Sequence, residues 1–387
     1  MAAGNVRIHF VLDPRATRWA DIAALDEPDI ARAPQRFVGG RNSWIAQSYL
    51  RLRTAIAARG WTASAGPGFP AGAICIAHRD DVNRFASGAH ASFLVVVRAD
   101  RAPVEACDVA IVQNSLARER HERFVPLWPQ PGLVAREARR GERIERLAYH
   151  GRTSSAPAWF GDPELHRQLA RRGVALEVKA RGWEDYREVD VALAARSDCR
   201  RILADKPATK LYNAWIAGAP MLASPEPAYC ELRRGPFDFI EVRGPADVLA
   251  AIDLLRANPH LYRAMADNGR ERGVSFDVDA TRARWMRLLE EDVVPAYQAA
   301  RIAPRRVWFV CAMARQKARS RMYRLRCRAQ AWLAAAAYPS ARPITSPTLL
   351  ESPSTARIDS SAARAWAWRP ASYFFQRSNA RARREAT

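Results

Sequence analysis

The chain has 387 residues, of which 49% are hydrophobic, and a net charge of +21. This length exceeds what one hydrophobic core usually organises, so two domains and an appendage are expected. The six cysteines are scattered, without the close pairs of a zinc site or the density of a disulfide scaffold, which favours a reducing compartment.

No targeting signal is visible in the sequence. Residues 1–13 lead directly into an apolar run, without the basic segment and cleavage site of a signal peptide. No apolar run is long enough to span a membrane. We therefore expect a cytoplasmic protein.

The positive charge is concentrated at the C-terminal end. Eighteen of the 61 basic residues and three of the 40 acidic ones follow residue 300, so residues 1–300 carry a net charge of only +6. The charge of the whole chain therefore says little about the partner of residues 1–300, and the partner of the tail is a separate question.

The first part of the chain has the pattern of a Rossmann-like domain, predicted over 1–130. Short apolar runs bounded by polar residues are typical of buried parallel strands. A helix is expected from Trp44 to Arg59, with Asn42 or Ser43 as its N-cap and Gly60 closing it. The predicted strands are Val6–Leu12, Ala73–His78, Ser92–Arg98 and Val109–Gln113.

Three prolines between Pro126 and Gly141 indicate a stiff connection, after which the strand and helix pattern restarts. We therefore predict a second Rossmann-like domain over 131–300. Its predicted strands are Ile144–His150, Val174–Lys179, Val189–Ala194 and Pro220–Ser224, and Phe237–Val242 is a further apolar run. Its predicted helices are Asp162–Arg172, a short one before Gly218, Pro245–Ala257, Pro259–Arg272 and Asp279–Leu289.

The short helix before Gly218 carries the clearest functional signal. Pro207 suits a first helical turn, and Gly218 with Pro220 supplies the stop. Unpaired N–H groups at the helix start, the Thr209 hydroxyl and the Lys210 ammonium together predict an anion site for a phosphate or diphosphate. The alternative is an ordinary solvated lysine.

The segment 301–387 differs in character from the rest. Arg305–Tyr338 is compatible with a basic helix that carries apolar residues among its arginines. The remainder is rich in Ser, Pro, Ala and Arg and is predicted to be disordered.

Several segments of the chain are distinctive together. In the N-terminal part they are GGRNSWIAQSYLRL at Gly39–Leu52, with the AHRDD, VQN and LWPQPGL segments. In the C-terminal part they are LAYHGR at 147–152, DVALAAR at 190–196, KPATKLYNAWIAGAPML at 206–222, and the segments NPHLYRAMADNGRERG and RWMRLLEEDVVPAY. With these segments the chain resembles, over about residues 5–300, the GT-B glycosyltransferases with a "glycosyl transferases group 1" type domain, in a bacterial subgroup of uncharacterised members.

The resemblance implies two Rossmann-like domains facing a cleft and transfer of a sugar from a nucleotide-sugar, without a bound metal or other cofactor. The C-terminal domain would hold the donor and the N-terminal domain the acceptor. Many relatives have two glutamates separated by seven intervening residues in the donor site, where this chain has Asp205 and Asn213. Glu226 could supply a carboxylate instead, and Asn213 remains a candidate contact; local capping or turn roles are the alternative.

Further candidates follow strand ends, where ligands of open α/β sheets bind. Arg152 could grip a donor phosphate. Gly39, Gly40 and Asn42 form a candidate acceptor or phosphate loop, although an ordinary turn explains the glycines equally well. If the reaction inverts, His78 or Asp80 could deprotonate the acceptor, against the alternative of a solvated charged loop.

Three functions compete at this point. The first is a hexosyltransferase-like enzyme that acts on a glycan, polysaccharide or lipid-linked acceptor; the second is a catalytically degenerate nucleotide- or sugar-binding scaffold. The third is nucleic-acid binding by the tail. Attachment of the tail to an anionic membrane surface, at the inner face of the cell membrane, explains the same composition and is preferred over nucleic acid.

Overall fold

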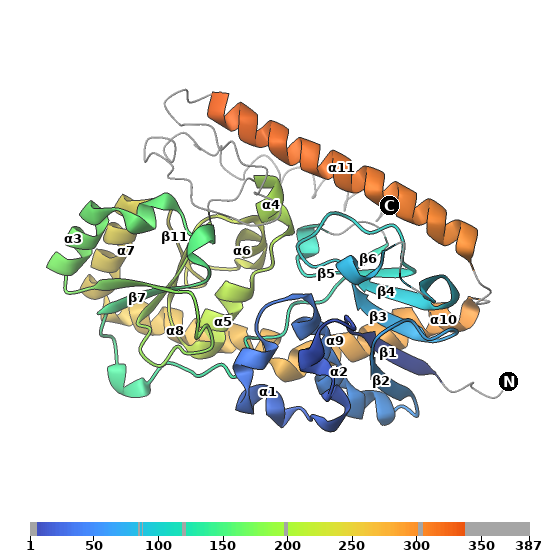
Figure 1. Cartoon of the computed structure of the whole chain (residues 1–387). Helices are drawn as coiled ribbons and strands as arrows, with labels where there is room; N and C mark the ends of the chain where they lie inside the picture. Colours follow the sequence, from blue (N-terminus) through green and yellow to red (C-terminus); the bar gives the residue numbers. More distant parts are fainter. Residues whose placement is uncertain are drawn as a thin grey trace, which may run out of the picture. The chain divides into compact units, whose positions relative to one another are not determined.

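Two parallel β-sheets, each with its own helices, make up the computed structural model (Figure 1). It describes residues 6–83, 86, 88–117, 121–196, 200–300 and 305–336. Met1–Gln330 form one compact unit and Ala331–Thr387 a second; both sheets, and α11 as far as Gln330, belong to the first unit. The predicted α/β class with two Rossmann-like sheets is confirmed.

The first sheet has the strand order β2-β1-β3-β4-β5-β6, and every pairing is parallel. The predicted strands in this part of the chain are confirmed, but the edge strands β2 and β6 were not predicted, because they lack the apolar runs of the inner strands. The strands are β1 (Arg7–Val11), β2 (Thr62–Gly66), β3 (Ile74–His78), β4 (Phe93–Val97), β5 (Val109–Val112) and β6 (Glu122–Phe124).

The second sheet has the order β11-β10-β9-β7-β8 and is also parallel. Four of the five strands correspond to predicted ones, and β11 lies in the apolar run Phe237–Val242. They are β7 (Arg146–His150), β8 (Ala175–Lys179), β9 (Val191–Ala194), β10 (Met221–Ala223) and β11 (Ile240–Glu241).

The helices are α1 (Pro28–Arg32), α2 (Arg41–Ala57), α3 (Pro163–Arg171), α4 (Arg200–Asp205), α5 (Thr209–Ala217), α6 (Pro227–Leu232), α7 (Pro245–Ala257), α8 (Pro259–Gly273), α9 (Val278–Leu288), α10 (Val294–Ala299) and α11 (Arg306–Ala336). Most of them match the predictions, whereas the short helices α1, α4, α6 and α10 were not predicted. Residues 337–387, where a disordered tail is predicted, lie outside the described residues.

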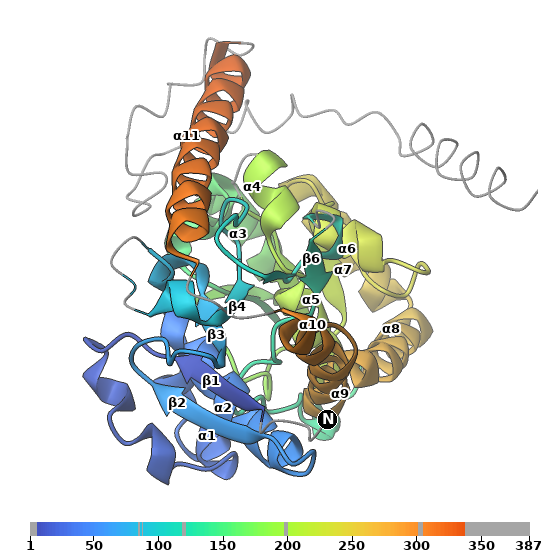
Figure 2. The same cartoon turned by 90° about the vertical axis from the view of Figure 1, so that its right-hand side faces the viewer.

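The first sheet is covered on its two faces by different parts of the chain. Side chains alternate along each strand, so Ile74 and Ile76 face a core that α2, α9 and the segment after α9 complete. The other face carries Cys75, Ala77, Leu94, Val96 and Ala110, and Phe309 and Ala312 of α11 pack against it. The basic helix predicted as part of a tail therefore belongs to the first domain by packing, as its position beside β3 and β4 shows (Figures 1 and 2).

Helix α9 returns from the second domain to the first. Trp285, Met286 and Leu289 are buried in the core beneath the first sheet, where the ring of Trp285 lies 5.6 Å from that of Trp44. The predicted boundary near residue 130 separates the two sheets, but packing assigns residues 278–299 to the first domain. The two domains are therefore joined by two crossings of the chain.

In the second domain, α5 packs closely against α8. A Cβ on Gly269 would lie 3.2 Å from Cδ1 of Trp215, and one on Gly273 would lie 3.0 Å from the backbone nitrogen of Ile216. Glycine at both positions lets the two helix backbones approach. The Trp215 indole also donates to the carbonyl of Asp238 at 2.9 Å, which fixes α5 over the sheet.

Replacing Trp285 by alanine tests whether α9 holds the first domain together. The side chain is fully buried (0% exposed), so its removal should destabilise the domain by about 3–5 kcal/mol. The expected result is a clearly lower denaturant midpoint for the first unfolding transition. Leu254→Ala, at a side chain 46% exposed on α7, is the control and should leave the midpoint nearly unchanged. Equal midpoints for the two variants would contradict the assignment of α9 to the first domain's core.

Candidate functional site

The carboxyl ends of the second sheet bring polar side chains from separate strands to one edge. β7 ends at His150 and β8 at Lys179, which are paired in register. Arg196 follows β9, and Glu226 follows β10. Parallel strands end at the same edge of a sheet, and ligands of open α/β sheets bind there.

Helix α5 begins at Thr209, with Ala208 as its N-cap and no side chain capping its first turn. Pro207 therefore precedes the helix and does not lie in its first turn, whereas Gly218 ends the helix in the left-handed conformation as predicted. The Thr209 hydroxyl shares a hydrogen bond of 3.1 Å with the hydroxyl of Tyr212. The helix N-terminus thus has the backbone geometry that suits an anion.

Lys210 reaches from α5 to the end of β7. Its ammonium nitrogen lies 3.9 Å from the centre of the Tyr149 ring, within the range of a cation–π interaction. Its charge also acts on the neighbouring His150. The predicted anion-binding lysine is therefore directed to the edge of the second sheet.

His150 is the residue at this edge that the sequence analysis missed. Its side chain is 7% exposed, and Nδ1 lies 2.9 Å from the carbonyl oxygen of Trp183. A carbonyl only accepts, so Nδ1 carries the proton and Nε2 carries a lone pair. Nε2 is buried and has no hydrogen-bond partner among the described residues. Burial, with the nearby charges of Lys179 and Lys210, lowers the pKa of His150 to about 4.

Arg152 lies two residues beyond the end of β7, immediately before a short 3₁₀ turn. It is exposed, and no ion pair joins it to the part of the chain that the structure describes. Its guanidinium is therefore available to a ligand at this edge, as the candidate donor role requires.

Glu226 is buried, 1% exposed, and its carboxylate pairs with Arg196. The Ser224 hydroxyl donates to the same carboxylate at 3.2 Å. A buried carboxylate of this kind is held by its charged partner, because an unpaired charge there would be strongly unfavourable. Its candidate role as a sugar contact stays a prediction that competes with this ion pair.

The two positions that correspond to the relatives' glutamates have structural partners. Asp205, at the end of α4, accepts from Arg98 at 2.8 Å and from the Tyr323 hydroxyl of α11 at 2.7 Å. The Asn213 amide oxygen accepts from the backbone N–H of Gln130 at 3.2 Å. Asp205 therefore ties the second domain to the first and to α11, and Asn213 ties α5 to the connection between the domains.

The edge of the first sheet gathers the other candidates. Gly39 and Gly40 have φ angles of +74° and +78°, which L side chains rarely adopt. Gly40 is the N-cap of α2, so the expected N-cap role of Asn42 or Ser43 is wrong. Asn42 lies in the first turn instead, where its amide oxygen accepts from the N–H of Asp13 and its amide nitrogen donates to Asp81, both at 3.0 Å.

Asp81 is a second residue that the sequence analysis did not single out. Burial raises the pKa of its carboxyl group to about 6, against the opposing effect of Arg41, whose Nε lies 2.9 Å away. A carboxyl group that titrates near neutral pH has the property a general base needs. The Arg41 pair and the Asn42 hydrogen bond hold it in place.

His78 and Asp80 lie at the end of β3 and in the turn that follows it. The backbone N–H of Asp80 donates to Nδ1 of His78 at 3.1 Å, so the lone pair of the neutral imidazole is already used. Asp80 forms ion pairs with Arg101 at 3.2 Å and Arg79 at 3.5 Å. The base assignment to His78 or Asp80 stays a prediction, and the Asp80 carboxylate is the more available group.

The structure thus places the candidates at two sheet edges. Thr209, Lys210, Arg152 and Glu226 lie at the edge of the second sheet. Gly39, Gly40, Asn42, His78 and Asp80 lie at the edge of the first. Within the described residues, no group of three His, Cys, Asp or Glu side chains is placed to hold a metal ion. None of the helices in the described ranges is long and apolar enough to cross a membrane.

Comparison with known proteins gives structural likenesses only. No known protein family and no curated protein matches the chain. Sucrose-phosphate synthase from Thermosynechococcus elongatus has a TM-score of 0.49 and 12% identity, over 75% of this chain and 100% of that one. Anabaena HepE in complex with UDP and glucose has a TM-score of 0.44 and 12% identity, over 74% and 100%. Both TM-scores lie below 0.5 and assign neither a fold family nor a function. The fold class is assigned from the two parallel sheets.

The protonation state of His150 can be measured directly. Because the folded-state pKa is lowered to about 4 from 6.5, the imidazole should be neutral at pH 5.5. Side-chain NMR of the imidazoles should show a ring titrating near pH 4 that is absent from the variant His150→Gln. Burial also lowers the pKa of His78 to about 4, so a second such ring should remain in that variant. Stability contributed by this site should be lost as the pH falls from about 6.5 to 4, where the unfolded chain binds the proton more readily. A His150 imidazole that titrates between pH 6 and 7 would contradict the buried, lysine-flanked geometry.

Proposed function

We propose that the chain is a glycosyltransferase of the GT-B type that transfers a sugar from a nucleotide-sugar donor. The observation that carries the proposal is the position of Lys210, at the start of α5, over the ring of Tyr149 at the edge of the second sheet, where its charge also acts on His150. A cationic group and a helix N-terminus directed at one strand end suit a diphosphate. The resemblance of the surrounding sequence to GT-B glycosyltransferases supports the same reading.

The proposed mechanism needs charge stabilisation more than covalent chemistry. As the bond between sugar and diphosphate breaks, negative charge develops on the leaving oxygen. Lys210 and the N–H groups at the start of α5 would bind that charge, and Arg152 could add a guanidinium. Because these groups supply positive charge, we propose that no metal or other cofactor is required.

His150 has a defined place in this proposal. The imidazole ring is neutral at physiological pH, and its Nε2 carries a lone pair. Nε2 can therefore accept a hydrogen bond but cannot donate one. A hydroxyl of the donor is the natural partner of such an acceptor. His150 would thus orient the donor beside the cations that bind its diphosphate.

The acceptor would be bound by the first domain, at the edge that holds Gly39, Gly40 and Asn42. Asp80 or His78 would deprotonate its hydroxyl in an inverting reaction, and the raised pKa of Asp81 makes this neighbour a further candidate base. We propose a glycan, polysaccharide or lipid-linked acceptor, and a cytoplasmic site of action at the inner face of the membrane. The basic α11 is the feature that supports the membrane location.

A nucleotide- or sugar-binding scaffold without turnover is the second candidate. It is favoured by the structural roles of Asp205 and Asn213, which are bound by Arg98, Tyr323 and Gln130. Side chains that already hold such partners are less available to form hydrogen bonds with a sugar. Donor turnover discriminates between the two functions, since a scaffold binds a nucleoside diphosphate but releases no product from any donor.

The variant Lys210→Ala tests the catalytic role of the anion site. Loss of a charged hydrogen bond of about 1.5–3 kcal/mol should lower kcat/KM for transfer or donor hydrolysis by roughly 10- to 150-fold. Turnover is measured on a panel of nucleotide-sugars by release of the nucleoside diphosphate. Arg171→Ala, on the exposed end of α3, is the matched removal of a positive charge and should keep wild-type turnover.

Thermal unfolding of the two variants checks that neither substitution disturbs the fold. Wild-type turnover in the Lys210→Ala variant would remove this residue from the mechanism. An absence of turnover in the wild-type protein across the whole panel, with retained nucleotide binding, would favour the scaffold.

A further inference from the structure

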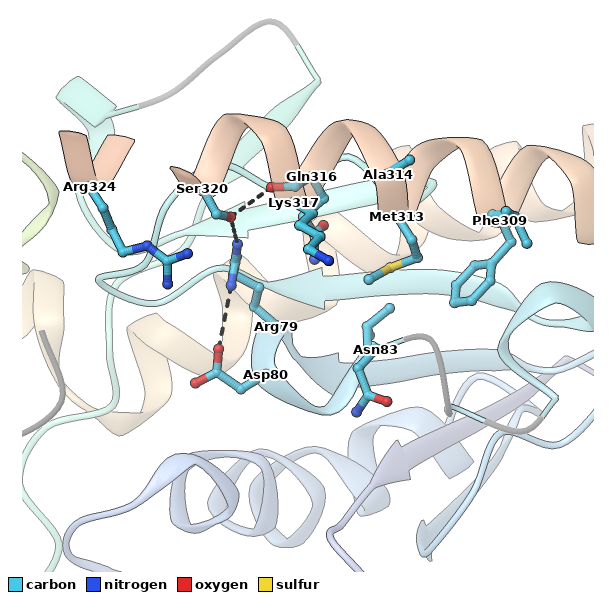
Figure 3. Close-up of a pocket in the computed structure, with 12 residues that line it drawn as sticks. Arg79, Asp80, Asn83, Phe309, Met313, Ala314, Gln316, Lys317, Ser320 and Arg324 are labelled. Carbon is cyan, nitrogen blue, oxygen red and sulfur yellow. Dashed lines mark hydrogen bonds and ion pairs between the residues drawn. The ribbon is translucent and has the colours of Figure 1, made fainter. Parts of the chain in front are cut away.

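A groove outside the candidate donor site runs between α11 and the turn that follows β3. Its volume is about 740 Å³, which is within the range of pockets that hold small molecules. One wall is the segment from Arg79 to Asn83, and the other is the side of α11 that carries Phe309, Met313 and Lys317. Figure 3 shows these α11 side chains directed toward the segment below them.

The groove combines an apolar part with a cationic part. Phe309, Val310 and Met313 of α11 and Val82 of the opposite wall provide the apolar surface. Lys317 and Arg324 line the groove nearer the C-terminal end of α11. Both are exposed and form no ion pair with the residues that the structure describes. Arg79 is a third cation there, but it is occupied by Asp80 and the Ser320 hydroxyl.

This arrangement matches one class of ligand. An alkyl chain in the groove would remove apolar side chains from water, which favours binding in proportion to the apolar surface buried. A phosphate matches two cations that form no ion pair within the described part of the chain. Both features occur together in a lipid with an anionic headgroup, whereas a free phosphate would leave the apolar part unused.

The outer surface of α11 points to a membrane as the source of that lipid. Val307 and Val310 lie one turn apart and are 79% and 66% exposed; Met322 and Leu325 are 50% and 56% exposed. Exposed aliphatic side chains among arginines are typical of helices that lie in the interface of an anionic bilayer. A helix in this position would bring the groove next to the lipid headgroups.

We propose that the groove between α11 and residues 79–83 binds a phosphate-bearing membrane lipid through Lys317 and Arg324, with the alkyl chain against Phe309 and Met313. Asp80 lines the same groove. The bound lipid would therefore lie beside a candidate base of the first domain. The role of this lipid as the acceptor of the sugar rests on the function proposed above.

The experiment uses the full-length chain and dihexanoylphosphatidic acid, a soluble short-chain lipid, in calorimetric titrations. Inorganic phosphate and dihexanoylphosphatidylcholine are the comparison ligands, because the first lacks the chains and the second carries a zwitterionic headgroup. The acidic lipid is expected to bind at least tenfold more tightly than either. Equal binding of inorganic phosphate would overturn the lipid assignment.

The double variant Lys317→Glu/Arg324→Glu should weaken binding of the acidic lipid by at least tenfold, and Met313→Asp should weaken it independently. Arg171→Glu/Arg326→Glu makes the same change in net charge at exposed positions outside the groove and should bind as the wild type does. If a groove variant unfolds, Lys317→Gln/Arg324→Gln replaces it. Equal loss in the control variant, or no loss in the groove variants, would overturn the site.

Donor hydrolysis in the same variants separates this inference from the proposed function. The groove variants should hydrolyse the nucleotide-sugar at the wild-type rate, because Lys210 and His150 are unchanged, yet lose transfer to a lipid acceptor. If the wild type binds lipid but neither the wild type nor any variant hydrolyses a donor, the proposed transferase function is refuted and the lipid site is retained. Hydrolysis without lipid binding in the wild type would refute the lipid site alone.

Discussion

The close contact between α5 and α8 is the constraint on which the candidate donor site depends. Gly269 and Gly273 leave no Cβ between the two backbones, and the Trp215 indole is held by the carbonyl of Asp238. These contacts fix the axis of a helix of only nine residues. Its first turn is thereby held at the edge of the second sheet, where Lys210 meets Tyr149 and acts on His150. A preorganised cation of this kind stabilises developing charge without having to reorient during the reaction.

Helix α11 changes how the first domain is understood. The connections from β3 to β4 and from β4 to β5 contain no α-helix among the described residues, so one face of the sheet would lack a cover. Phe309 and Ala312 supply it. Tyr323 of the same helix reaches Asp205, which Arg98 of the first domain also binds. A single basic helix therefore completes a core, contacts both domains and forms one wall of the groove for which lipid binding is proposed.

Much of this fold could be predicted from the sequence, because the inner strands are short apolar runs and the long helices have clear stops such as Gly218. The edge strand β2 could not, since Thr62–Gly66 is made of small residues with little apolar signal. In the site, the position of Lys210 followed from a local helix start. His150 was missed because its importance depends on burial and on Lys179 and Lys210, which only the folded chain brings near it. The partners of Asp205 are 107 and 118 residues away in the sequence, beyond the reach of any local pattern.

The most direct test of the account is whether the second domain recognises a diphosphate through the start of α5. Calorimetry would compare each nucleoside diphosphate with its own nucleoside, in the wild-type protein and in Lys210→Ala. The account predicts that at least one diphosphate binds wild type tenfold or more tightly than its nucleoside, and that most of this gain is lost in the variant. A diphosphate that binds no better than its nucleoside, or a gain that survives the loss of Lys210, would contradict it.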